Sequence, residues 1–140
     1  MSRIFWDTNL FIYLFEDWGK FSGQVTALRS RMLARGDQLL TSTITLAEIL
    51  VKPMQNGDTK AVVYYRKLIT TMTVVITFEE SAALVYARLR ADRSLRAPDA
   101  IQLACAATAG VDLFITNDVR LHSKQIDGIQ FIVPLDRLPI

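Results

Sequence analysis

The stretch LFITND, residues 113–118, is an apolar run that ends abruptly in three small polar residues. The stretch IFWDTN, residues 4–9, has the same form near the other end of the chain and ends in Asp7, Thr8 and Asn9. Short apolar runs rich in β-branched and aromatic residues are typical of β-strands. Both stretches are therefore predicted to be strands that deliver polar side chains to their carboxyl ends.

The rest of the chain alternates between strand-like and helix-like segments. Strands are predicted at residues 3–6, 38–41, 73–78, 113–116 and 130–133, and helices at 9–18, 22–36, 43–53, 58–72, 79–94 and 98–110. This alternation indicates an α/β fold with a mainly parallel sheet, and the continuously apolar strands indicate helices on both faces. Ligands of such sheets bind beyond the carboxyl ends of the strands, where Asp7 and Asp118 are expected.

Length and composition favour one globular domain spanning residues 1–140. The chain has 51% hydrophobic and 21% charged residues, which is an ordinary composition for a globular protein, so we do not expect it to be disordered. It has neither an apolar run of membrane-spanning length nor a signal-peptide pattern, so we expect a soluble, cytoplasmic protein. The single cysteine, Cys105, lies in an apolar segment and is expected to be a buried small residue. The net charge of +2 favours binding of polyanions only slightly.

Four of the 14 carboxylates lack an ordinary explanation in a turn, a boundary or an exposed position: Asp7, Glu48, Asp99 and Asp118. Taken singly, Asp7 and Asp118 could cap helices, and Asp99 could complement a helix dipole. Glu48 is harder to explain, because it shares a helical face with Ile44 and Val51 in a segment with almost no other polar surface. A glutamate on a buried face is expected only when it is paired or binds a metal. The alternative explanation for Glu48 is that one edge of this helix is exposed.

Together the four acids predict a cation site at one end of the sheet. Crowded carboxylates repel one another and require a neutralising cation. Oxygen ligands suit one or two Mg²⁺ or Mn²⁺ ions, whereas the single histidine, His122, excludes a histidine-rich zinc site. Such ions can activate water and stabilise charge on a phosphodiester.

These motifs, in this order, resemble those of PIN-domain ribonucleases, and most closely the VapC-type toxins of toxin–antitoxin pairs. The resemblance rests on IFWDTN, the glutamate of TSTITLAEIL (41–50), RAPDAIQLACAATAG (96–110) and LFITND. It implies a three-layer α/β/α fold with a sheet of about five strands. It also implies that the metal ligands are four acids, with Glu48 acting partly as general base: Asp7, Glu48, Asp99 and Asp118. The resemblance further implies that Thr116 orients metal-bound water and that three neighbours support the ligands: Asn9, Thr8 and Asn117.

The activity that the resemblance implies is Mg²⁺- or Mn²⁺-dependent endonucleolytic cleavage of single-stranded or looped RNA, leaving 5′-phosphate and 3′-hydroxyl ends. The implied partners are an antitoxin and a second copy of the chain. Segment 9–18 is a candidate groove for an antitoxin helix and segment 61–69 a candidate dimer face, although core packing also explains both. The candidate RNA contacts, which an ordinary solvated face would explain equally well, are Arg88, Arg90, Arg93, Arg96, Lys52 and Arg120.

The alternative is a non-catalytic module that binds RNA or protein and uses the acids as structural caps. Metal binding that depends on Asp7 and Asp99 would discriminate against this alternative. A phosphatase of the haloacid-dehalogenase kind is disfavoured, because Asn9 stands where a second aspartate is needed. No glycine-rich nucleotide-binding loop occurs either.

Overall fold

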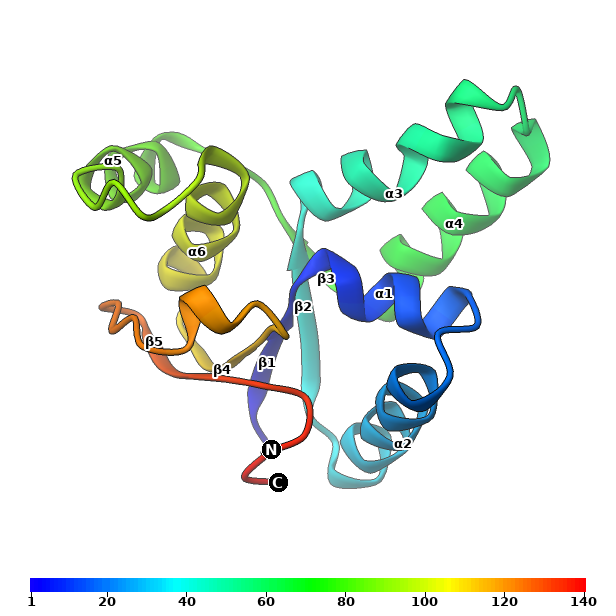
Figure 1. Cartoon of the computed structure of the whole chain (residues 1–140), viewed down its shortest axis with the longest axis horizontal. Helices are drawn as coiled ribbons and strands as arrows, with labels where there is room; N and C mark the ends of the chain where they lie inside the picture. Colours follow the sequence, from blue (N-terminus) through cyan, green and yellow to red (C-terminus); the bar gives the residue numbers. More distant parts are fainter.

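A computed structural model describes residues 1–140 as a five-stranded parallel sheet with helices on both faces (Figure 1). The strands are β1 (Arg3–Trp6), β2 (Gln38–Ser42), β3 (Val74–Ile76), β4 (Val111–Ile115) and β5 (Ile129–Val133), in the spatial order β3-β2-β1-β4-β5. The helices are α1 (Thr8–Phe15), α2 (Lys20–Arg35), α3 (Thr43–Gln55), α4 (Thr59–Met72), α5 (Glu80–Leu89) and α6 (Ala97–Ala109), with a 3₁₀ turn, η1 (Val119–Leu121). The expected α/β/α architecture is confirmed, and every strand pair is parallel.

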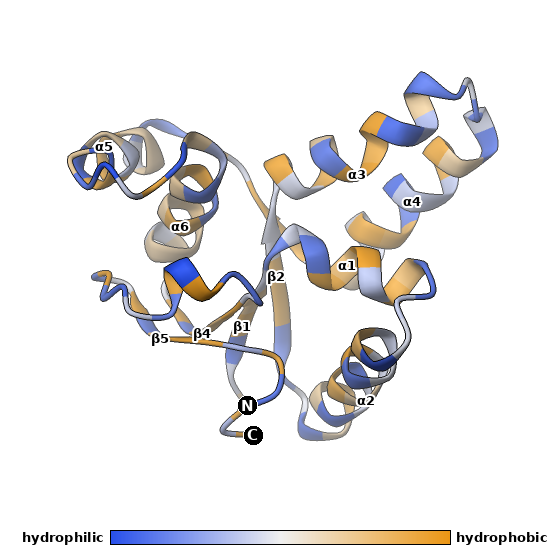
Figure 2. Cartoon of the chain, in the orientation of Figure 1, coloured by the Kyte–Doolittle hydropathy of each residue, from blue (hydrophilic) through white to orange (hydrophobic).

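The core is divided into two apolar layers by the sheet, because successive side chains of a strand point to opposite faces. Ile4 and Trp6 of β1 pack in the layer formed with α1–α4, whereas Phe5 packs in the layer formed with α5 and α6. Phe5 stacks on Phe114 of β4 with ring centroids 5.1 Å apart. In Figure 2 the strands carry hydrophobic residues, while helices α2, α3 and α4 carry both hydrophobic and hydrophilic ones.

The order of the strands creates a crevice beside β1. From β1 the chain first builds β2 and β3 on one side, and later β4 and β5 on the other. The connections that leave the adjacent strands β1 and β4 therefore diverge, which is the point where open α/β sheets bind ligands. Ile115 O of β4 accepts a hydrogen bond of 3.1 Å from the backbone N–H of Asp7, so the two strand ends are held together.

Several element boundaries differ from those predicted. Helix α3 does not stop at Pro53 but runs to Gln55, because a proline in the last turn removes only one hydrogen-bond donor and α4 packs alongside. Helix α5 ends at Leu89 rather than at residue 94, and the chain then forms turns. Helix α2 begins at Lys20, before Ser22, whose hydroxyl instead accepts from the backbone N–H of Trp18. Not one of the helices has both the length and the apolar character that crossing a membrane requires.

Candidate active site

Asp7 lies at the end of β1 and serves two neighbours at once. Its Oδ1 accepts a 2.7 Å hydrogen bond from the backbone N–H of Thr8 and so caps α1, while its Oδ2 accepts a 2.8 Å bond from Thr116 Oγ1. Burial raises the pKa of Asp7, and the negative charges of Asp99 and Glu48 raise it further, against the opposing effect of these hydrogen bonds. Thr116, fully buried at the end of β4, thus ties the two strand ends together through a carboxylate.

Asp99 and Asp118 face each other across an arginine. The Arg120 guanidinium forms an ion pair with Asp118, donating from Nε at 2.9 Å, and its Nη2 lies 3.6 Å from Asp99 Oδ2. Hydrogen bonding by Arg120 lowers the pKa of Asp118. Burial and the charge of Asp118 raise the pKa of Asp99, although Arg120 and Arg96 oppose this. The positively charged guanidinium of Arg120 therefore lies close to both acids.

Glu48 projects from α3, and its Oε1 accepts a 2.9 Å hydrogen bond from Thr8 Oγ1. The expectation that its helical face is buried is wrong: Glu48 is exposed and Val51 is 51% exposed. Helices α3 and α4 form a pair that extends away from the sheet, so only Thr45, Ile49 and Pro53 of α3 are buried (Figure 1). Glu48 thus needs no buried ion to explain its position; it lies at the mouth of a cavity.

All four acids line one cavity of about 410 Å³. They come from four parts of the chain, namely the ends of β1 and β4 and the helices α3 and α6. Two arginines and a buried glutamine share the lining, whose residues are Asp7, Thr8, Asn9, Ile12, Glu48, Arg96, Pro98, Asp99, Gln102, Asp118 and Arg120.

The three supporting residues named from the sequence occupy different positions. Thr8 is 6% exposed and contacts Glu48, and Asn9 is exposed at the cavity wall. Asn117 is not brought to the cavity, because its Oδ1 accepts a 3.0 Å bond from the backbone N–H of Leu135. Sequence reasoning missed Gln102, which lies three residues after Asp99 and is 2% exposed. A glutamine inside the apolar run AIQLACAATA was the available signal.

Two further residues lie away from the cavity. His122 is half-buried, and its Nε2 lies 2.7 Å from the carbonyl oxygen of Thr116. Cys105 is fully buried, as expected, and burial raises the pKa of its thiol to about 11. The thiol is therefore protonated at neutral pH and has no nucleophilic role.

The residues of the cavity fit a divalent cation by their chemistry. The candidate ligands are carboxylate oxygens, which Mg²⁺ and Mn²⁺ prefer. Two of these carboxylates, Asp99 and Asp118, already have a positive charge beside them in the Arg120 guanidinium. No three acidic side chains converge closely enough to enclose an ion by themselves. Mg²⁺ usually takes one or two protein carboxylates, with water and substrate phosphate completing its shell, so an open arrangement suits it.

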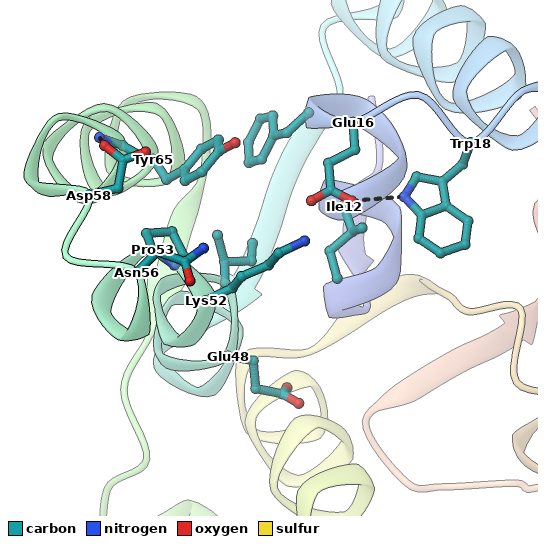
Figure 3. A pocket seen from close by; sticks show the side chains of 12 residues that line it. Ile12, Glu16, Trp18, Glu48, Lys52, Pro53, Asn56, Asp58 and Tyr65 are labelled. Carbon is teal, nitrogen blue, oxygen red and sulfur yellow. Dashed lines mark hydrogen bonds between the residues drawn. The ribbon is translucent and has the colours of Figure 1, made fainter.

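A second hollow, of about 360 Å³, adjoins the cavity between α1 and the pair α3–α4 (Figure 3). Its walls carry Ile12, Phe15 and Tyr65, and Lys52 extends from α3 into the space between the helices (Figure 3). Ile12 and Glu48 line both hollows. Anything that filled this groove would therefore contact the edge of the acid cavity.

A parallel α/β sheet with carboxylates gathered at its topological switch point offers oxygen ligands of the kind that divalent cations bind. The model of the PIN domain family matches residues 4–126. The chain belongs to the PIN domain family. No curated protein sequence shows significant similarity to it.

Solved toxin–antitoxin structures share this fold. The chain is similar to one in VapBC2 from Rickettsia felis bound to a promoter DNA fragment, with a TM-score of 0.71, 15% identity, and coverage of 94% of this chain and 98% of that one. VapBC-1 from nontypeable Haemophilus influenzae matches with a TM-score of 0.70 and 22% identity, and the match covers 96% of this chain and 99% of that one. A toxin–antitoxin complex from Klebsiella pneumoniae matches with a TM-score of 0.64 and 25% identity, and the match covers 90% of this chain and 94% of that one.

Proposed function

We propose that this protein is a metal-dependent endoribonuclease and the toxin of a toxin–antitoxin pair. The observation that carries the proposal is the single cavity lined by Asp7, Glu48, Asp99 and Asp118. Caps alone would leave no reason for these acids, from four elements, to share one cavity. Membership of the PIN domain family and the likeness to chains of toxin–antitoxin complexes support the same function.

The four acids would together hold one or two Mg²⁺ or Mn²⁺ ions, each through one or two carboxylates, with water and substrate phosphate completing its shell. When bound, such a cation neutralises charge on a phosphodiester and lowers the pKa of a coordinated water. Thr116 would keep Asp7 oriented, since its hydroxyl already donates to Oδ2. Glu48 would hold the ion or its water through Oε2 and act partly as general base, because its hydrogen bond from Thr8 occupies Oε1.

Two arginines at the cavity would position the RNA backbone. Arg96 and Arg120 both line the cavity, and phosphate contacts by arginine supply affinity without sequence preference. Of the other basic candidates, Lys52 lies in the adjoining groove, and Arg90 donates to Tyr86 Oη and lies over its ring. RNA binding through these residues would weaken as salt concentration rises.

An antitoxin would occupy the groove between α1 and α3–α4. Apolar side chains flanked by Glu16, Lys52 and Asp58 suit the apolar face of an amphipathic helix (Figure 3). Because this groove shares Glu48 with the acid cavity, a partner there would hinder substrate access. Self-association would use α4, where Val63 and Tyr64 are 62% and 60% exposed.

The test is cleavage of a single-stranded RNA pool, followed by total cellular RNA, with Mn²⁺ or EDTA. The control is an Asp7→Asn/Asp99→Asn double variant shown to be folded by circular dichroism. We expect cleavage that requires metal and both carboxylates and leaves 5′-phosphates. Metal-independent cleavage would contradict the mechanism. Failure to bind Mn²⁺ at all would support the non-catalytic alternative, in which the acids are caps.

A further inference from the structure

A buried group of polar side chains lies beneath the acid cavity, centred on Gln102 of α6. Gln102 is 2% exposed, Thr8 is 6% exposed, and Thr45 and Ser42 are fully buried. These residues belong to four elements, α6, α1, α3 and β2, so their hydrogen bonds join the parts of the chain that surround the site. Buried polar groups need partners, and here the side chains supply them to one another.

The Gln102 amide has a partner for each of its hydrogens. Its Nε2 donates to Thr8 Oγ1 at 3.0 Å and to Thr45 Oγ1 at 2.7 Å. Its Oε1 accepts from Ser42 Oγ at 2.5 Å. An amide nitrogen has two hydrogens, so both are used on the threonines, and the serine holds the opposite end of the amide.

This arrangement directs the hydroxyl of Thr8. Because Thr8 Oγ1 accepts from Gln102, its single hydrogen is left to donate. Glu48 Oε1, at 2.9 Å, is a carboxylate oxygen that only accepts. Thr45 Oγ1 is also 3.1 Å away, but it already lies within hydrogen-bond distance of both Gln102 Nε2 and Thr41 Oγ1. The hydrogen of Thr8 therefore goes to Glu48.

We propose that Gln102 is a positioning residue which, through Thr8, fixes the carboxylate of Glu48 at the acid cavity. Glu48 is exposed on a helix that extends from the sheet, and a free glutamate there would sample many rotamers. A directed hydrogen bond from a buried hydroxyl selects the one that faces the cavity. The inference rests on the proposed function in one respect, that Glu48 acts on a bound cation.

The test measures Mn²⁺ affinity by titration calorimetry in variants of nearly unchanged volume. Gln102→Met and Thr8→Val should each weaken Mn²⁺ binding by roughly tenfold, the lower end of the effect of residues that orient metal ligands. Thr8→Ser keeps the hydroxyl and should restore most of the affinity. The control is Thr108→Val, on α6 like Gln102. The Thr108 hydroxyl donates to the carbonyl oxygen of Cys105, away from the cavity.

A background variant separates positioning from a general loss of structure. In Glu48→Gln, neither Gln102→Met nor Thr8→Val should weaken Mn²⁺ binding further, because the proposed path passes through Glu48. An equal additional loss in that background would overturn the inference. If Gln102→Met fails to fold, the Thr8→Val and Thr8→Ser pair still tests the last link.

The outcomes distinguish this inference from the proposed function. Wild-type protein that binds Mn²⁺ while Gln102→Met and Thr8→Val bind it equally well would refute the positioning role and leave the metal site intact. Wild-type protein that binds no Mn²⁺ would refute both.

Discussion

Asp7 combines a cost in stability with a proposed catalytic role. Its folded-state pKa is raised, chiefly by burial, because the ionised carboxylate is better solvated in the unfolded chain than in the folded protein. Asp7→Asn should raise the free energy of unfolding by roughly 0.5–2 kcal/mol at pH 7.5 in EDTA, because asparagine also caps helices. RNA cleavage should fall at least about a hundredfold, as when a transition-state charge partner is removed.

The sign of the pH dependence provides a check on this explanation. As the pH falls through the raised pKa of Asp7, the folded state takes up a proton before the unfolded state does. The cost of the buried charge then disappears, and the stability advantage of Asp7→Asn should shrink toward acid pH in thermal melts. An advantage that is constant with pH would mean that the burial of the charge is not its cause.

Arg120 competes with any metal for Asp99 and Asp118. Its guanidinium contacts both carboxylates, so binding an ion there requires the arginine to move. Arg120→Ala should therefore tighten Mn²⁺ binding by about fivefold, in line with the modest strength of exposed ion pairs. Arg93→Ala, an exposed arginine outside the cavity lining, is the control. Weaker Mn²⁺ binding by Arg120→Ala would instead mean that the arginine orients the acids productively.

At the residue scale the sequence predicted the types of side chain at the cavity better than their surroundings. Asp7 and Asp118 follow strands, and strand ends at a switch point have only one place to meet, so their approach was predictable. Glu48 reached the cavity for a different reason from the one expected, because the sequence does not show that α3 leans away from the sheet. Gln102 was missed because one polar residue in a helix reveals no partners until the neighbouring elements are placed.

At the scale of elements, strand identity was predictable and helix ends were less so. Each predicted strand overlaps an observed one, since apolar β-branched runs flanked by polar residues have few other uses. Gly36 and Gly110 ended helices as expected, with φ of +74° and +72°. Pro53 did not end α3, because a proline in the last turn removes only one hydrogen-bond donor and α4 packs alongside the helix.

The approach of β5 to α6 depends on Gly128. This residue has φ of +97°, and a Cβ there would lie 2.3 Å from the carbonyl oxygen of Ala107. Gly128→Ala should therefore destabilise the protein by about 3 kcal/mol or more, since strain in the backbone adds to a clash that only a shift of β5 or α6 can relieve. Urea denaturation measures the change.

Gly23 provides a control of opposite sign. It lies inside α2, and a Cβ there would meet nothing within 4 Å. Gly23→Ala should stabilise the protein by about 0.5–1 kcal/mol through helix propensity. If both alanine variants changed stability alike, close packing at Gly128 would not explain its effect.

At the scale of the whole molecule, the apolar layers and the acid cavity are separate structures. The two apolar layers lie on the faces of the sheet, and the four acids line a cavity at the carboxyl ends of β1 and β4. Folding energy thus comes from burial of the layers, while the cavity contributes repulsion among the acids. The fold was accessible from sequence patterns for this reason, since the pattern of the layers is independent of the site.

Removing metal should therefore leave the fold intact while abolishing cleavage. We expect far-UV circular dichroism in EDTA to match that in Mn²⁺, because no element depends on an ion for its hydrogen bonds. Mn²⁺ at about 100 times its dissociation constant should nevertheless stabilise the folded state by about 2.7 kcal/mol, as any ligand specific to that state does. The Asp7→Asn/Asp99→Asn variant should lose this gain and keep its fold. Loss of secondary structure in EDTA would instead make the ion structural, and the acid cavity would then be part of what holds the sheet together.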